Sequence, residues 1–182
     1  SRVDLQRYEV DHAEETLGVY LAMDGNNTAE CAALRKKAEE FADCIRTGFI
    51  SRDDAVVALH TTFMKSLEYP LEATTMTKKQ WDYVMGPIMM ASLPRMGYVR
   101  TFPRNIVYAS KDYCGLGVMH PWYHQQLLHI IALLEHTQQQ TMTGQLLSTS
   151  YEQLRLEMRT SSYMTDNQYL SPLHNLRCRR HP

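Results

Sequence analysis

Long apolar runs are missing from this 182-residue sequence. The longest covers residues 127–134, is interrupted by His129, and falls far short of the roughly 20 residues that span a bilayer. We therefore expect no membrane helix. Neither sign of charge dominates, because 19 Lys and Arg face 20 Asp and Glu, so the overall charge predicts no partner. The 44% hydrophobic and 21% charged content excludes a wholly disordered or fibrous chain.

Cysteines are few and far apart. Their spacing favours reduced thiols over a disulfide framework, and so an intracellular location in the cytoplasm or nucleus. The chain starts with Ser1 and shows no cleavable targeting pattern, so we expect it to be a piece of a longer polypeptide. The cysteines are Cys31, Cys44, Cys114 and Cys178.

Motifs that would mark an active site are also lacking. The sequence has no nucleophile elbow and no glycine-rich phosphate loop. Adjacent aspartates such as Asp53 and Asp54 can hold magnesium, but these follow Ser51 at the start of a predicted helix, which favours a capping role. The spacing of four histidines and one cysteine matches no common zinc site. We therefore predict no catalytic residue and no metal ligand. The histidines and the cysteine considered as zinc ligands are Cys114, His120, His124, His129 and His136.

Turn and capping signals predict a hairpin and then helices. Alternation near Val3 and a β-favouring run over residues 16–21 predict a β-hairpin within residues 1–24. A capping box of Asn27 and Glu30 predicts a helix over residues 28–47, closed by Gly48.

A second capping box, Ser51 with Asp54, predicts another helix that ends before Tyr69 and Pro70. The two helices are expected to form an antiparallel αα-hairpin.

The downstream half is also predicted to be helical. Thr77 caps a third helix, bent at Pro87 and broken by Pro94 and Gly97. A short helix over 103–107, a glycine-punctuated extended stretch over 113–118, a long helix over 121–136 and one or two helices over 138–159 follow. We predict a mainly α fold with an N-terminal β-hairpin and five to seven helices. Its parts are residues 1–24, 25–110, 111–160 and a mobile tail over 161–182.

Charge is segregated along the chain. Residues 78–111 hold six basic residues and one acid, whereas residues 112–154 contain no Lys or Arg. Aromatic residues interleave with the basic ones, a combination suited to binding phosphates and stacking bases. A solvated basic surface over an aromatic core fits the same pattern, and both interpretations stay open. The aromatic residues are Trp81, Tyr83, Tyr98, Phe102 and Tyr108.

The order of these pieces resembles the reverse transcriptases of non-LTR retrotransposons. Residues 15–25, ETLGVYLAMDG, resemble the hairpin that forms their primer grip after the catalytic palm. The helix over 28–47, the exit LEYP at residues 67–70 and the aromatic third helix resemble their thumb. Residues 113–123, YCGLGVMHPWY, resemble a segment downstream of the thumb. The resemblance covers residues 3–136.

The resemblance implies a thumb-like bundle in a fragment of an RNA-directed DNA polymerase, a transferase. The palm motif Tyr-x-Asp-Asp is absent, so the chain by itself should not polymerise, and no cofactor is expected in it; magnesium would belong to the missing palm. The implied partners are the rest of the polymerase and a primer–template duplex, RNA–DNA or DNA, gripped by phosphate and sugar contacts. No membrane is implied.

Candidate contacts follow from this resemblance. Thr16, Leu17 and Gly18 match the primer grip, where Gly18 would let the backbone approach the primer end closely; a β-bulge in a packed hairpin explains the same glycine. The nucleic-acid-binding candidates are Lys36, Lys37, Arg52, Lys78 and Lys79.

Two alternatives remain open from the sequence. Methionine-rich helices could make a free-standing protein–protein interaction module, since methionine side chains adapt to many partners. The sequence has 11 methionines, among them Met85, Met89, Met90 and Met96. A metal-dependent hydrolase that uses the histidines is the other possibility.

Overall fold

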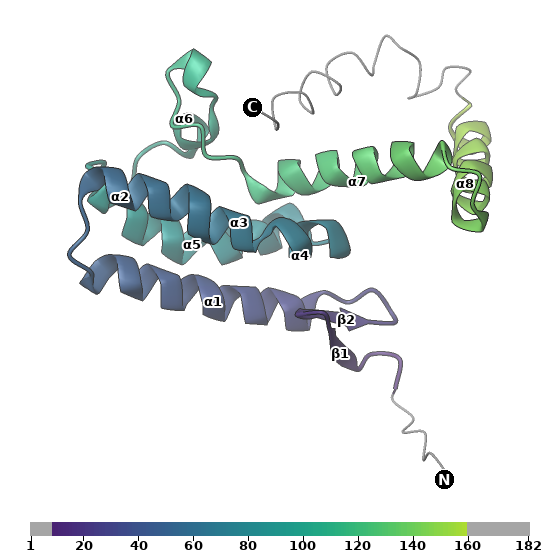
Figure 1. Cartoon of the computed structure of the whole chain (residues 1–182), viewed down its shortest axis with the longest axis horizontal. Coiled ribbons are helices and arrows are strands. Elements are labelled where there is room, and N and C mark those ends of the chain that lie inside the picture. Colours follow the sequence, from purple (N-terminus) through teal and green to yellow (C-terminus); the bar gives the residue numbers. More distant parts are fainter. Residues whose placement is uncertain (1–8, 160–182) are drawn as a thin grey trace. The chain divides into compact units, whose positions relative to one another are not determined.

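The computed structural model describes residues 9–159, in which a two-stranded hairpin precedes a series of helices (Figure 1). The predicted mainly α fold is confirmed. Two compact units meet between Gln125 and Gln126, and each is described by itself. The alternation predicted near Val3 and the tail predicted over 161–182 lie outside the described residues.

Strands β1 (Ala13–Thr16) and β2 (Val19–Ala22) pair antiparallel, with Thr16 opposite Val19. The predicted hairpin is confirmed, and its turn divides the β-favouring run over residues 16–21. Leu17 and Gly18 form a two-residue loop with φ of 52° and 83°, because a tight hairpin turn needs two residues in the left-handed region. Gly18 therefore forms a turn and not a bulge.

Helix α1 (Thr28–Thr47) buries one face and ends at Gly48 as predicted. The predicted Asn27–Glu30 capping box is wrong, since the Asn27 side chain makes no cap bond. The Thr28 backbone N–H donates instead to Asn26 Oδ1 at 2.9 Å. The buried Glu30 carboxylate accepts from the Tyr20 backbone N–H at 2.8 Å, so it joins the hairpin to the helix. Burial raises the pKa of Glu30 despite that hydrogen bond.

A second helical run lies antiparallel to α1 (Figure 1), and Phe41 and Phe63 bring the two into ring contact, with centroids 5.3 Å apart. The predicted capping box of Ser51 and Asp54 is confirmed. The predicted end before Tyr69 and Pro70 is confirmed, since the run that begins at Arg52 ends at Ser66. A further short helix follows at once, and Pro70 lies in its first turn, where a missing N–H costs nothing. The run comprises α2 (Arg52–Val57), the π-helix η1 (Ala58–Phe63) and α3 (Met64–Ser66), and the short helix is α4 (Glu68–Ala73).

Helix α5 (Lys78–Arg95) is the centre of the first unit. Thr77 caps the helix as predicted, in a capping box with Gln80 that was not predicted. The helix continues through Pro87 and ends at Arg95, between the two residues that were predicted to break it, Pro94 and Gly97. Gly97, with φ of 88°, follows the end of the helix. Contacts between α1 and α5 keep a nearly constant sequence offset, as in the bonded pairs Arg35–Tyr83 and Arg46–Arg95, which makes the two helices parallel. Asn27 and Thr75, which precede the two helices, are bonded with the same offset.

The chain then forms α6 (Arg104–Tyr108), the 3₁₀ turn η2 (Lys111–Tyr113), α7 (Pro121–Thr137) and α8 (Met142–Met158). The predicted helices over 103–107, 121–136 and 138–159 are confirmed to within a few residues. The stretch after η2 pairs back onto α6, with Val118 N–H donating to Val107 O at 3.2 Å. Within residues 9–159, no helix is both long and apolar enough to cross a membrane.

Candidate functional site

Arginines from two distant segments line one groove beside α5. Arg35 and Arg46 come from α1, while Arg100 and Arg104 come from the segment that leads into α6. The groove has a volume of about 700 Å³. On α1 the lining residues fall at positions 35, 39, 43 and 46, which lie on one side of a helix with 3.6 residues per turn. The parallel packing of α1 on α5 brings this side next to the arginines of the later segment.

Each α1 arginine pairs with a carboxylate about one turn away on its own helix. Arg35 Nε lies 2.6 Å from Glu39 Oε1, and Arg46 Nη2 lies 2.9 Å from Asp43 Oδ1. The Arg35 guanidinium also donates to the Tyr83 backbone carbonyl and lies 4.3 Å from the centroid of the Tyr83 ring. These contacts fix the guanidinium group at the wall of the groove.

Arg100 and Arg104 have no carboxylate partner among residues 9–159. Arg104 Nη2 reaches the Arg100 carbonyl at 3.5 Å, whereas its buried Nη1 has no hydrogen-bond partner. Four arginines against two carboxylates leave the groove with an excess of positive charge. Guanidinium N–H groups without a carboxylate partner can donate to anionic oxygens, and the planar guanidinium matches the geometry of a phosphate.

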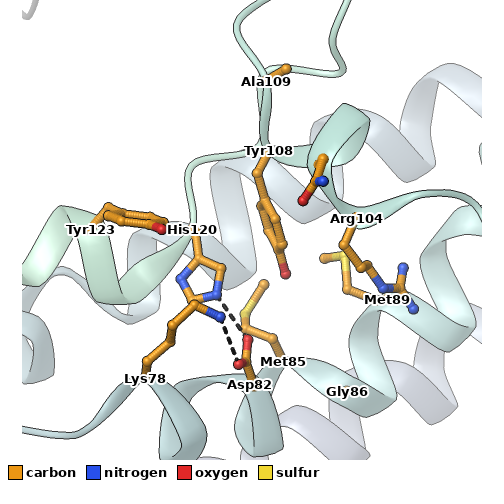
Figure 2. Close-up of a pocket in the computed structure, with 11 residues that line it drawn as sticks. Lys78, Asp82, Met85, Gly86, Met89, Arg104, Tyr108, Ala109, His120 and Tyr123 are labelled. Atoms are coloured by element: carbon orange, nitrogen blue, oxygen red, sulfur yellow. Dashed lines mark hydrogen bonds and ion pairs between the residues drawn. The ribbon is translucent and has the colours of Figure 1, made fainter.

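A second cavity, of about 570 Å³, shares Gly86 and Arg104 with the groove, so the two hollows are neighbours along α5. Figure 2 shows Tyr123, His120 and Tyr108 in a row, with Lys78, Asp82 and Met85 rising from α5 toward them. All of these residues belong to the first unit.

A hydrogen-bonded chain crosses this cavity. The Trp122 backbone N–H donates to His120 Nδ1 at 3.1 Å, so the ring proton lies on Nε2, which donates to Asp82 Oδ1 at 2.9 Å. Lys78 Nζ lies 3.0 Å from Asp82 Oδ2. Partial desolvation of Asp82 raises its pKa, but the hydrogen bonds from His120 and Lys78 outweigh that effect and lower the pKa below its usual value.

Three rings form one wall of the cavity. The His120 ring meets Tyr108 at a centroid distance of 4.6 Å and Tyr123 at 5.5 Å, both edge to face. Burial raises the pKa of Tyr108, with Arg104 opposing the shift. The Tyr108 phenol is therefore neutral at pH 7 and can donate a hydrogen bond.

The predicted contact residues are scattered. Lys36 and Lys37 are exposed on α1, about 100° and 200° round the helix from Arg35. Arg52 is exposed at the start of α2, with its guanidinium packed over Gly97, and Lys79 is exposed on α5. Of these five basic residues, Lys78 alone lines either of the two cavities.

Arg35 and Arg46 are the residues that the sequence analysis missed. Their i, i+11 spacing, with Glu39 and Asp43 between, marks one stripe of α1 and could have indicated a charged face. Arg100 and Arg104 belong to the basic segment but gave no local signal of a shared groove.

The primer-grip residues Thr16, Leu17 and Gly18 are all exposed at the tip of the hairpin. Space around Gly18 is open, since a Cβ added there would meet nothing within 4 Å. A ligand backbone can therefore approach the loop.

The candidate metal residues do not gather. Within residues 9–159, no group of three or more His, Cys, Asp and Glu side chains is placed to hold a metal ion. Asp54 caps α2 as predicted. Cys31, Cys44 and Cys114 are free thiols, and Cys178 lies outside the described residues.

Three of the four methionines named for the interaction module are not on the surface. Met85, Met89 and Met96 are buried in the core of the first unit, and Met90 is half-exposed in the arginine groove. Comparison of the chain with protein-family models, curated proteins and solved structures gave no match.

Proposed function

We propose that this chain binds the sugar–phosphate backbone of a nucleic-acid duplex, as the thumb part of a retroelement RNA-directed DNA polymerase whose catalytic residues lie elsewhere. The observation that carries the proposal is the groove in which Arg100 and Arg104 add positive charge without a carboxylate partner in the described part of the chain. The resemblance of residues 3–136 to reverse transcriptases supplies the identity of the duplex, RNA–DNA or DNA. The interaction-module alternative has less support, because Met85, Met89 and Met96 are core residues.

The arginines suit backbone contact rather than base readout. Phosphate contacts hold a duplex in place without reading its sequence, as a thumb must while the duplex moves past it. Each phosphate neutralised by Lys or Arg releases counterions, so such binding weakens as salt rises. The carboxylates of Glu39 and Asp43 neutralise part of the groove's positive charge. This lowers the affinity for phosphates and so favours release of the ligand.

Titration of a labelled RNA–DNA hybrid with the full chain tests the proposal. We expect wild-type affinity to fall steeply between about 50 and 200 mM salt. Arg100→Gln should weaken binding severalfold and flatten the slope of log K against log salt by about 0.9 for each phosphate that the variant no longer neutralises.

Lys65→Gln is the matched control, because Lys65 is exposed, lines neither cavity and pairs with Glu68. It removes the same charge and should leave both affinity and slope unchanged. Salt-independent binding, or equal effects of the two variants, would contradict the proposal.

A further inference from the structure

The cavity next to the arginine groove has the composition of a pocket for a planar ring. Buried Met85 and Met89 of α5 form an apolar floor, and Tyr108, His120 and Tyr123 supply aromatic walls (Figure 2). Its volume of about 570 Å³ falls inside the range of roughly 300–1,000 Å³ that is typical of small-ligand sites. Tyr123 is 58% exposed, so much of its ring remains open to a ligand.

The polar groups of this cavity favour a ligand with hydrogen-bond acceptors. Asp82 is its one carboxylate, and it is already engaged by His120 and Lys78. The groups left to act are mainly donors: the neutral Tyr108 phenol, the Asn105 amide and the Arg104 guanidinium, whose Nη1 is buried without a partner. A nucleobase offers ring nitrogen and carbonyl acceptors together with a π-face.

Arg104 and Gly86 connect this cavity to the groove proposed for the phosphates. One nucleotide could therefore place its phosphate at Arg104 and its base among the rings. Gly86 contributes no side chain at the junction, where the nearest atom to an added Cβ would be Arg35 Nη1 at 3.5 Å.

We infer that the cavity holds one unstacked nucleotide at a single-stranded end of the duplex whose backbone lies in the groove. This inference rests on the proposed function and adds a strand-end site to it. Aromatic stacking accepts every base, so the site should bind without sequence preference.

Binding of the full chain to three hybrids tests it: one blunt, one with a single unpaired nucleotide at an end, and one whose unpaired nucleotide is abasic. The overhang is placed at the 3′ end in one series and at the 5′ end in another. We expect the intact overhang at one end to bind about fivefold tighter than the blunt hybrid or more. The abasic overhang should bind like the blunt hybrid, since it lacks the stacking ring.

Tyr123→Ala should remove the gain from the overhang while blunt-hybrid affinity is unchanged. Tyr113→Ala, the same change at an exposed tyrosine that lines neither cavity, should keep the gain. A melting curve confirms that each variant is folded, and the abasic comparison on the wild-type chain needs no variant.

The outcomes separate the two proposals. Absence of blunt-hybrid binding would overturn the proposed function. Salt-sensitive blunt binding with no gain from either intact overhang would overturn the strand-end site alone. Binding of a free nucleoside monophosphate without any overhang gain would assign the pocket to a free nucleotide and likewise overturn the inference.

Discussion

The two sides of α5 use polar side chains in opposite ways. Toward the start of α7, polar groups are buried and pair between elements: Trp81 Nε1 donates to Gln125 Oε1 at 2.9 Å, and Gln125 Nε2 donates to the Thr74 carbonyl. Trp81 and Gln125 are completely inaccessible to solvent. These bonds join α5, α7 and the residue that follows α4.

Along the groove, the arginines of α1 are more exposed and each pairs with a carboxylate of its own helix, as Arg35 does with Glu39, although Arg35 also donates to the Tyr83 carbonyl of α5. Such pairs contribute only a few tenths of a kcal/mol to stability, whereas an orphaned buried polar group costs about 1–3 kcal/mol. The contrast separates the residues that maintain the fold from those that remain available to a ligand.

Gln125→Met tests the buried side and should have the largest effect. The methionine preserves the length of the side chain but leaves the Trp81 indole N–H and the Thr74 carbonyl without this partner. We expect the free energy of unfolding to fall by about 2–4 kcal/mol. Urea denaturation followed by tryptophan fluorescence measures it.

Gln126→Met, at the neighbouring exposed position, is the control and should change stability by less than about 0.5 kcal/mol. Equal losses in the two variants would mean that the buried bonds do not maintain the fold.

Local signals explain which features of the fold could be predicted. The Ser51–Asp54 box and the Thr77 cap each lie within one helical turn, and both form. The Asn27–Glu30 box fails because Glu30 is recruited by Tyr20, a tertiary contact that a four-residue motif does not contain.

The candidate site was less predictable for the same reason. Trp81 follows from helical periodicity, but Gln125 lies 44 residues away and is polar. Nothing local marks it as a core residue. The groove depends on the parallel packing of α1 on α5, which no spacing rule specifies, so the sequence did not show that Arg35 and Arg104 line the same groove.

Asp82→Asn tests an intermediate case, because Asp82 is half-exposed yet bonds the buried His120. The folded-state pKa of Asp82 lies below the ordinary value of 3.8, so its charge stabilises the fold above that pH and the contribution disappears as pH falls through the folded-state pKa. At pH 7 we expect a loss of less than about 1 kcal/mol, since solvent screens the pair with Lys78.

Thermal melts of both proteins from neutral to acid pH provide the measurement. The difference in melting temperature should be constant at neutral pH and shrink below pH 3.8, the ordinary pKa of an aspartate. A difference that grows as pH falls would contradict the assigned direction.

Lys36→Gln and Lys37→Gln test the exposed side with the smallest expected effect. The two lysines are adjacent and exposed, and both lie within α1. Around the helix axis, Lys36 lies about 100° from Arg35, whereas Lys37 lies about 200° from it, on the side away from the groove. If the groove binds the duplex, Lys36→Gln should weaken hybrid binding about twofold at low salt, because a charge at the rim acts within a Debye length. Lys37→Gln should not change it.

Glutamine is used because Lys37 lowers the pKa of the buried Glu30, and an added carboxylate there would disturb the hairpin contact. Stability should stay within about 0.5 kcal/mol for both variants. A larger loss of binding from Lys37→Gln would place the duplex on the opposite face of α1, and the groove would then not be its site.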